Sequence, residues 1–432
     1  MKNRILILLF ALLAVAVANA QTMREEIEAN PNRAGGIYCH YTEPVVAPTP
    51  APRGYKPFYI SHYGRHGCRY QASRDTYAKP LAVLEAAAAA KHLTPLGEDV
   101  LRRLRIIADD AYLREGDLTA RGEREHRGIA RRMMDNYPEV FRAKRGEGHI
   151  SCFSTHYSRC ILSMSVFADE LKGRYPGLDI SRESTRRNAY FMACDKGLES
   201  IRSQAIKLAR KYQVANTDDR AFLERLFGDY DYAIELIKEV YKSKRTYQFF
   251  DNMHGIAIVM QDCDHLGISM HDIFTADERY AMWRIMNVRR YLTYGPSVEF
   301  GDVRMTDGKP LLRDIIERAE KVVSGEAPNE AATLRFGHDS YIIPLLALMQ
   351  IEGCCGRIDF SQFDRLPEVW CDSRVTSMAV NVQFVFFRNK RGEVLVKMMH
   401  SEREVRLPIA SDEAPFYRWE EFKAYCASLY ND

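Results

Sequence analysis

The chain has 432 residues, with 61 Lys and Arg against 58 Asp and Glu, a formal net charge of +3. This length suits two domains, or one large domain with an insertion. The small net charge excludes the strongly basic field that attracts nucleic acids, so we expect no nucleic-acid partner.

The first 20 residues have the composition of a secretory signal peptide. MKNRILILLFALLAVAVANA has a basic start, an apolar run and an Ala-x-Ala-like end, which places the expected cut after Ala20. The apolar run is short for a membrane span, and Gln21 is not the cysteine that a lipoprotein anchor needs. Without Lys2 and Arg4 the remaining 59 Lys and Arg face 58 acids, a charge of +1. We expect a periplasmic or secreted protein without stable membrane insertion.

All ten cysteines follow this segment: Cys39, Cys68, Cys152, Cys160, Cys194, Cys263, Cys354, Cys355, Cys371 and Cys426. In an oxidising compartment some of them should pair, although the spacing does not give the connectivity. No Cys-x-x-Cys occurs, so a thiolate zinc site is not expected.

The predicted elements begin after a proline-rich stretch. Residues 43–57 favour an extended chain, and we expect an extended lead-in over 21–53. Apolar periodicity and capping residues then predict elements in this order: strand 58–63, helices starting at Thr94-Pro95 and at Thr119, strand 149–155, and a helix through Leu162, Val166 and Phe167.

Residues 181–304 are predicted to be mostly helical, with a cap at 217–219 and a Thr275-Glu278 capping box. After Pro310 the pattern predicts a helix, strand 333–337, a second helix and a final β-hairpin. We therefore expect an α/β fold whose mixed, mostly parallel sheet is flanked by helices. This core covers 54–180 and 305–432, and 181–304 forms an inserted helical cap domain.

A strand followed by a polar cluster and a helix occurs three times, at 58–70, 150–167 and 333–349. The carboxyl ends of strands in an open α/β sheet converge on one crevice. Six side chains of these clusters are expected to meet there: Arg65, His66, Arg69, Arg159, His338 and Asp339.

The first cluster, GRHGCRY, has the composition of an anion site. Arg65 and Arg69 offer planar donor forks that suit phosphoryl oxygens. Between two cations His66 would stay neutral and nucleophilic, and Gly67 would allow a tight turn with room for a ligand. The alternative is a surface turn with two solvated arginines and a helix-capping histidine.

The other clusters are individually weaker. Arg159 could be a third phosphate ligand or a solvated helix-terminal charge, and Thr155 and His156 could line the pocket. His338 could donate to a phosphate, and Asp339, beside that anion, would have a raised pKa and hold a proton for a leaving alcohol. The alternative for the last pair is a helix N-cap aspartate beside a satisfied histidine. A His-Asp metal site would need more histidines at helical spacing, so no metal is expected.

The sequence leaves two roles open for two cationic residues that follow the first cluster. Arg74 and Lys79 could meet further phosphates of a substrate or could be solvated charges on a loop.

These motifs resemble those of a known family. GRHGCRY resembles the RHGxRxP signature of the histidine acid phosphatases, and GHD resembles their distal His-Asp motif. The similarity is closer to the multiple inositol polyphosphate phosphatase group, in TxxGxxE from Thr119 to Glu125, SRC around Arg159 and LRFGHDSYIIPLLALM. Two departures occur: Gln71 stands where the family has proline, and Asp339-Ser340 stands where that group has Ala-Glu.

The resemblance implies a two-step displacement without a metal or other cofactor. His66 would form a phosphohistidine, Asp339 would protonate the leaving alcohol, and Arg65, Arg69, Arg159 and His338 would hold the phosphate oxygens. The implied substrates are small phosphomonoesters of polyols, inositol phosphates such as phytate first. The alternatives are a broad acid phosphatase or sugar-1-phosphatase, a non-catalytic exported anion-binding protein, and a phosphatase using Cys68 or Cys160. Nothing in the sequence specifies an oligomeric state.

Overall fold

The computed structural model describes residues 22–142, 148–192 and 198–431, so the expected signal peptide lies outside the described residues. A mixed sheet of eight strands runs through the core in the order β3-β2-β4-β1-β5-β6-β7, with β8 paired to β6. Its strands are β1 (Lys56–Arg65), β2 (His149–Ser154), β3 (Asp179–Glu183), β4 (Glu330–Gly337), β5 (Asn381–Arg388), β6 (Val394–His400), β7 (Arg403–Glu404) and β8 (Phe416–Arg418).

The first four strands are parallel, and the C-terminal strands are antiparallel. β4 pairs in parallel with both β1 and β2, and β2 pairs in parallel with β3. β5 pairs antiparallel with β1, and β5 and β6 form the predicted antiparallel hairpin. This topology confirms the predicted α/β class with its mixed sheet.

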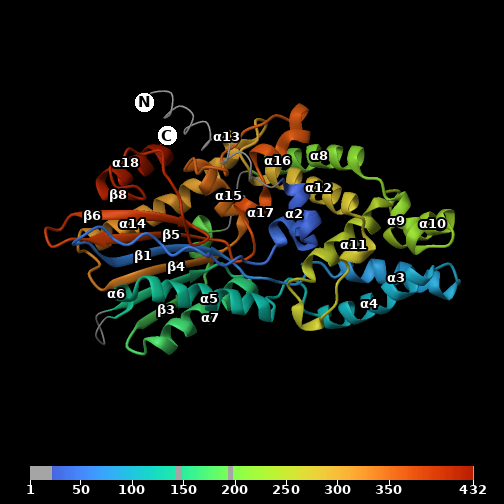
Figure 1. Ribbon diagram of the computed structural model, residues 1–432, viewed down its shortest axis with the longest axis horizontal. Coiled ribbons are helices and arrows are strands. Elements are labelled where there is room, and N and C mark those ends of the chain that lie inside the picture. The colour runs from blue at the N-terminus through green and yellow to red at the C-terminus, as the bar shows by residue number, and fades with distance from the viewer. Residues whose placement is uncertain (1–21, 143–147, 193–197, 432) are drawn as a thin grey trace, which may run out of the picture.

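Helices cover both faces of the sheet (Figure 1). α5 (Ala120–Asn136) and α7 (Ser158–Arg174) lie on one face, and α14 (Lys309–Val323) and α18 (Trp419–Tyr430) lie on the other. The side chains of β1 alternate accordingly, because Ile60 packs in the cluster with α5 and α7 whereas Tyr59 packs in the cluster with α14 and α18. β1 is therefore buried on both faces.

A helical region lies at the other end of the molecule (Figure 1). It contains α8 (Glu199–Asn216), α9 (Arg220–Leu226), α10 (Tyr230–Tyr241), α11 (Tyr247–Val259) and α12 (Ala276–Tyr294), together with α3 (Asp75–Ala89) and α4 (Pro95–Ala111). α3 packs against α10 and α11, and α4 packs against α9. Helices from before residue 181 thus join the region predicted as an insertion. The domain boundaries remain a prediction, and β3 continues the sheet three residues beyond 180.

Short elements complete the chain. They are α2 (Met23–Ala29), α6 (Pro138–Phe141), α13 (Gly301–Arg304), α15 (Asp339–Leu348), α16 (Leu366–Val369), α17 (Asp372–Val375), and the 3₁₀ helices η1 (Pro31–Tyr38), η2 (Arg186–Phe191), η3 (Asp264–Leu266), η4 (His271–Ile273), η5 (Met305–Gly308) and η6 (Phe360–Arg365). Within the described ranges, no helix combines the length and the apolar character that crossing a bilayer requires.

The predicted extended lead-in is wrong over residues 23–38, which are helical as α2 and η1. Thr22 and Glu25 form a capping box at the start of α2, and Met23 and Ile27 pack against Trp283 of α12. A helix of seven residues shows too little periodicity to be recognised, and it is stabilised by this distant contact.

Helix caps were more predictable than helix lengths. The side chains of Thr94 and Thr119 accept hydrogen bonds at the starts of α4 and α5, and the Thr275-Glu278 capping box is present at α12. Apolar residues at four-residue spacing as far as Phe141 predict that the helix from Thr119 continues to that residue. The structure has two helices there instead, because α5 ends at Asn136 and Phe141 belongs to α6.

The nine cysteines that the structure describes are all free thiols, and Cys194 lies outside the described residues. All nine except Cys355 are buried. The expected disulfides are thus absent among the described cysteines. These thiols pack locally instead, as Cys39 does when its thiol donates to the carbonyl oxygen of Asn32.

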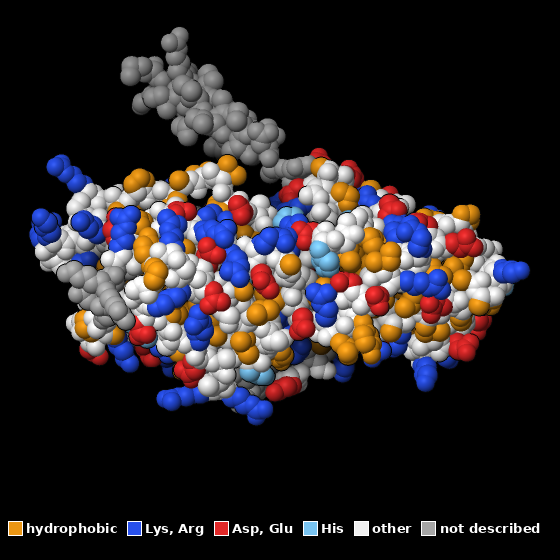
Figure 2. Space-filling model, turned by 90° about the horizontal axis from the view of Figure 1, so that it is seen from below, with side chains coloured by type: hydrophobic (Ala, Val, Ile, Leu, Met, Phe, Trp, Pro, Cys, Tyr) orange, Lys and Arg blue, Asp and Glu red, His pale blue; other side chains and the backbone are white. Residues whose placement is uncertain are grey.

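Charged side chains are mixed on the face that Figure 2 shows. Lys and Arg side chains lie among Asp and Glu side chains over the whole of this face. No continuous basic band crosses the part of the surface visible there.

Candidate active site

The three predicted clusters meet where β1, β2 and β4 end. Arg65 at the end of β1 pairs with Gly337 at the end of β4, and Ser154 at the end of β2 pairs with Phe336. The backbone amide of His66 donates to the carbonyl of Gly337 at 3.0 Å. As a result, the rings of His66 and His338 lie 5.6 Å apart between centroids, although 272 positions separate them in the sequence.

His66 is held in the form that a nucleophile requires. Its Nδ1 lies 2.9 Å from the carbonyl oxygen of Gly67, so Nδ1 carries the proton and donates it there. The lone pair of the neutral ring is then on Nε2. Burial, reinforced by the positive charges of Arg65, Arg159 and Arg69, holds the pKa of His66 well below its usual value. The lowered pKa favours the neutral form of His66.

Three arginines surround this imidazole with unused hydrogen-bond donors. Arg65 is 1% exposed, and its Nη1 donates to the carbonyls of Ile37 at 2.6 Å and Ser377 at 3.0 Å. Arg69 lies over the ring of Tyr38, and Arg159 lies over the ring of Tyr157. In the described structure the buried Nε atoms of all three arginines have no hydrogen-bond partner. Buried cationic donors without acceptors are costly, and an oxyanion with several oxygens satisfies them together.

His338 is a further possible hydrogen-bond donor beside His66. Its Nε2 lies 3.2 Å from the hydroxyl of Thr155 and 3.8 Å from the thiol of Cys160. Burial, followed by the charge of Arg159, lowers the pKa of His338 to about 3, so this ring is also neutral. Thr155 thus contacts a site residue, whereas His156 is exposed and stacks on Tyr157.

Asp339 lies where the sequence predicts it, but the arginines around its carboxyl group favour the charged form. Its Oδ2 lies 3.1 Å from Nη1 of Arg290, and its Oδ1 lies 3.9 Å from Nε of Arg65. Burial raises the pKa of Asp339, but Arg65 and Arg290 outweigh burial and hold it below its usual value. The raised pKa is predicted for a carboxyl group beside a bound anion and stays a prediction. Without that anion the two arginines lower the pKa, and the prediction did not include Arg290. The N-cap alternative does not hold either, because the N-cap of α15 is His338.

Arg290 is the site residue that the sequence did not reveal. It lies on α12, within the stretch VRRYL, where two adjacent arginines on a helix resemble a solvated face. The side chain is 25% exposed and reaches Asp339 from a part of the chain about 50 residues away. Only the packing of α12 against α15 brings the two together.

Two acidic residues fix the backbone of the loop that carries His66. Glu125 of α5 accepts from the amide of Cys68 at 2.8 Å, and Asp262 accepts from the amide of Arg69 at 3.4 Å. Burial, followed by nearby Asp262 and Glu125, raises the pKa of the Cys68 thiol well above its usual value. Glu125 is the last residue of the TxxGxxE stretch, so part of this stretch serves to hold the loop.

The close approach of α5 to this loop explains why two positions are glycine. A Cβ on Gly67 would lie 2.6 Å from the carbonyl oxygen of Gly122, and a Cβ on Gly122 would lie 2.4 Å from that of Cys68. Gly67 is therefore required by the approach of α5. The expected reason, room for a ligand, is wrong, since Gly122 occupies that side.

Gly122→Ala is expected to destabilise the protein by about 1–3 kcal/mol and to lower activity, because the new methyl group presses on the Cys68 backbone. Chemical denaturation and phosphate release measure both effects. Gly128→Ala on the same helix is the control, since its Cβ would meet the flexible end of Arg132 at 3.1 Å. A Gly122→Ala protein as stable and active as the wild type would contradict this account of the loop.

Arg74 and Lys79 have local partners in α3 and its surroundings. The guanidinium of Arg74 lies 4.8 Å from the ring centroid of Tyr112, and Lys79 pairs with Asp75 at 2.9 Å. In the part of the chain that the structure describes, neither contacts the six clustered residues. Their contact with further phosphates remains a prediction.

The thiols beside the site are not suited to be nucleophiles. Cys68 is buried and donates to Oε1 of Glu125 at 3.0 Å. Burial also raises the pKa of Cys160 to about 11. Since the thiolate is the reactive form, both cysteines are disfavoured as alternatives to His66.

The site has the wrong composition for a metal. Cationic and neutral nitrogen donors dominate it, and no group of three or more His, Cys, Asp or Glu suited to a metal ion occurs within the described residues. The expectation that the reaction needs no cofactor remains a prediction.

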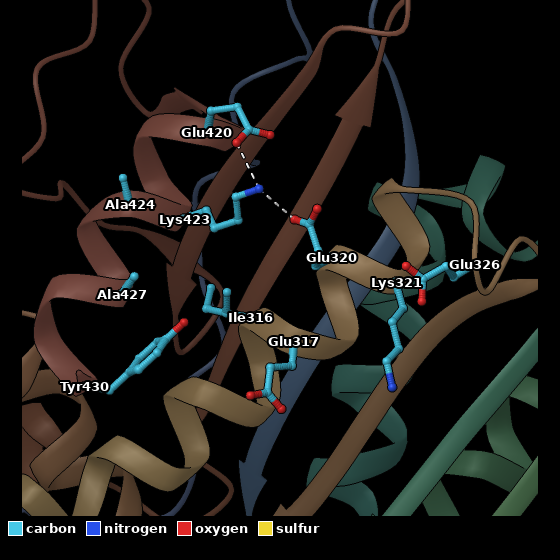
Figure 3. Close-up of a pocket in the computed structure, with 10 residues that line it drawn as sticks. All are labelled: Ile316, Glu317, Glu320, Lys321, Glu326, Glu420, Lys423, Ala424, Ala427 and Tyr430. Atoms are coloured by element: carbon cyan, nitrogen blue, oxygen red, sulfur yellow. Dashed lines mark hydrogen bonds and ion pairs between the residues drawn. The ribbon is translucent and has the colours of Figure 1, made fainter.

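A separate groove of about 600 Å³ lies between α14 and α18 (Figure 3). Four glutamates line it, Glu317, Glu320, Glu326 and Glu420, and Lys423 pairs with two of them. None of the predicted site residues lines this groove. Its acidic rim would repel a phosphate.

A neutral histidine and three arginines at the strand ends of an α/β sheet form a site that suits phosphoryl transfer. The model of the family "Histidine phosphatase superfamily (branch 2)" matches residues 65–401, so the chain belongs to this family. The protein is accordingly a phosphatase.

Solved structures with the same fold include three with low sequence identity. Multiple inositol polyphosphate phosphatase from Bifidobacterium longum, in complex with inositol hexasulfate, has a TM-score of 0.78 and 19% identity, covering 92% of this chain and 98% of that one. The phytase from D. castellii has a TM-score of 0.64 and 14% identity, covering 92% and 84%. Hafnia alvei phytase with myo-inositol hexakis sulphate has a TM-score of 0.54 and 12% identity, covering 88% and 98%. A comparison with curated proteins finds no match.

Proposed function

We propose that this phosphatase is an exported phosphomonoesterase that hydrolyses inositol polyphosphates through a phosphohistidine at His66. The observation that carries the proposal is the neutral imidazole of His66, with Nδ1 hydrogen-bonded to Gly67, among three arginines whose Nε donors have no hydrogen-bond partner in the described structure. A tetrahedral phosphoryl group matches this set of donors in both charge and number of acceptors.

In the first step, Nε2 of His66 attacks phosphorus and the bond from phosphorus to the ester oxygen breaks. The bonding electron pair stays with that oxygen, which takes a proton from the carboxyl group of Asp339 and leaves as an alcohol. In the second step, water attacks phosphorus and the bond to Nε2 breaks. The carboxylate of Asp339 accepts a proton from this water, so the carboxyl group and the free Nε2 of His66 are both regenerated.

The arginines and His338 act on the charge of the phosphoryl group. Arg65, Arg69, Arg159 and His338 would hold its oxygens, and each charge-assisted hydrogen bond contributes roughly 1.5–3 kcal/mol. Donors that are fixed before the reaction stabilise the transition state most, because they need no reorganisation. Arg65 is fixed in this way by the carbonyls of Ile37 and Ser377.

Similarity and charge support the proposed substrate class. Two of the similar structures hold inositol hexasulfates, which carry the sulfate analogue of each phosphate. Around the site Arg290 adds a fourth arginine to the three near His66.

Export is supported by the leader-like residues 1–20. The second candidate, a sugar-1-phosphatase or broad acid phosphatase, is favoured by the Asp339-Ser340 pair, which departs from Ala-Glu.

Phytate is expected to be hydrolysed with a kcat/KM at least about tenfold higher than glucose 1-phosphate under matched conditions, because one further charge-assisted contact is worth that factor. Phosphate release measures both rates, and chromatography of the inositol phosphates gives the position attacked. Equal values for the two substrates, or a preference for glucose 1-phosphate, would support the second candidate instead.

A further inference from the structure

The two arginines beside Asp339 differ in how they are held. Arg65 is 1% exposed, and two backbone carbonyls fix its Nη1. Arg290 comes from α12, is 25% exposed and lies over the ring of Tyr294 one turn away. Its Nη1 is 3.1 Å from Oδ2 of Asp339, yet this oxygen has no well-aligned hydrogen bond in the described structure. The Arg290 pair is the shorter of the two, but the side chain of Arg290 is more exposed and, unlike that of Arg65, is not fixed by two backbone carbonyls, so it is the one that can move away more easily.

This pair conflicts with the role of Asp339 as a proton donor. A carboxyl group that protonates a leaving alcohol must hold a proton before the bond breaks, whereas a neighbouring cation favours the carboxylate. The titratable and charged groups facing Asp339 are Tyr63 and Arg65 of β1, Arg69 of the following loop, Arg159 of α7, Arg290 of α12 and the adjacent His338. Among the arginines, Arg290 lies closest to a carboxylate oxygen.

We propose that Arg290 is a positioning residue that exchanges partners, pairing with Asp339 before substrate binds and with a phosphate oxygen of the substrate afterwards. The exchange rests on the proposed function, since it needs a phosphomonoester and Asp339 as its acid. A phosphate dianion attracts the guanidinium more strongly than one carboxylate does. Once Arg290 has turned away, Asp339 takes up from the solvent the proton that the alcohol later receives. Asp339 regains a proton from the attacking water and releases it to the solvent when phosphate leaves and Arg290 pairs with the carboxylate again.

The exchange is tested by pH profiles of the full-length enzyme and its Arg290→Gln variant. For an alkyl phosphate, activity falls on the alkaline side when the acid loses its proton. The profile of kcat/KM reports the free enzyme, and that of kcat reports the complex. Removing a neighbouring cation raises the pKa of Asp339, so the alkaline limb of kcat/KM should move up by about one pH unit or more. The limb of kcat should move less, because Arg290 has already left Asp339 in the complex.

p-Nitrophenyl phosphate serves as the internal reference, since its leaving group needs little protonation. Its alkaline limb should be the same in wild type and Arg290→Gln. Arg289→Gln removes the adjacent arginine of α12, which forms no ion pair with Asp339 in the described structure, and should leave the alkyl phosphate limb in place. Arg290→Lys keeps the charge and should also keep the limb.

Each outcome separates the exchange from the proposed function. A wild-type enzyme that releases phosphate from neither substrate overturns the proposed function itself. An active enzyme whose alkyl phosphate limb is unmoved in Arg290→Gln, or moves as far in Arg289→Gln, overturns the exchange alone. Thermal melting shows whether each variant folds. Arg290→Met, which keeps an unbranched apolar stem, replaces Arg290→Gln if that protein does not fold.

Discussion

Replacing His66 with alanine is expected to lower the rate of phosphate release by about four orders of magnitude or more while the protein stays folded. The imidazole forms a covalent bond to phosphorus, and this intermediate replaces one slow hydrolysis by two faster steps. The surrounding arginines cannot act as the nucleophile instead. The described site offers no substitute nucleophile, since Cys68 and Cys160 are buried thiols with raised pKa values.

This loss is measured as phosphate release from phytate and from p-nitrophenyl phosphate by the purified variant. Circular dichroism and thermal melting establish that it is folded. His156→Ala is the matched control, because His156 is exposed, stacks on Tyr157 and should be dispensable. A folded His66→Ala protein with a near-normal rate would show that another group attacks phosphorus.

Replacing Asp339 with asparagine is expected to slow the hydrolysis of alkyl phosphates by about 10²–10⁴-fold, the usual contribution of a general acid. Asparagine keeps the size of the side chain and its place between Arg65 and Arg290, but it has no carboxyl proton to give. For p-nitrophenyl phosphate the loss should be under about tenfold in the first step, because its leaving group departs without that proton.

The ratio of the two losses is the informative quantity. Removing the negative charge of Asp339 also leaves two arginines without their partner, and this would affect both substrates alike. Ser340→Ala, which changes the neighbouring side chain and keeps the carboxyl group, is the control. Equal losses on alkyl and nitrophenyl phosphates would argue that a different residue donates the proton.

The site residues that the sequence predicts lie directly after strands that the sequence also predicts. Short apolar strands end directly at Arg65-His66 and at His338-Asp339, and parallel strands bring such ends together. The distance between strand and cluster is then one or two residues, too short for a fold to separate them. Arg65, His66 and His338 could be predicted for this reason, and Arg69 and Arg159 follow a strand end within four or five residues.

Arg290 could not be predicted by the same argument. Arg290 belongs to α12, and no residue near it in the sequence indicates a contact with Asp339. The contact depends on how α12 packs against α15. The charge of Asp339 could not be predicted either, because it is the balance of burial against two cations, one of them unknown from sequence.

Elements were missed where tertiary contact stabilises a weak local pattern. β3 has the sequence DISRE, with no buried residue and no alternation, and it is a strand because it pairs with β2. α2 depends in the same way on Trp283 of α12. The sheet strands and capped helices were predictable, because an apolar strand or an N-cap threonine carries its signal within a few residues.

The central claim is that His66 becomes covalently phosphorylated during turnover, and trapping that intermediate tests it most directly. Enzyme and p-nitrophenyl phosphate are mixed and denatured rapidly under conditions that preserve phosphohistidine, and peptides are sequenced by mass spectrometry. The account predicts one phosphoryl group on the peptide that contains His66 and none in His66→Ala. A phosphoryl group on Cys68 or another residue, or sustained turnover with no phosphorylated peptide, would contradict it.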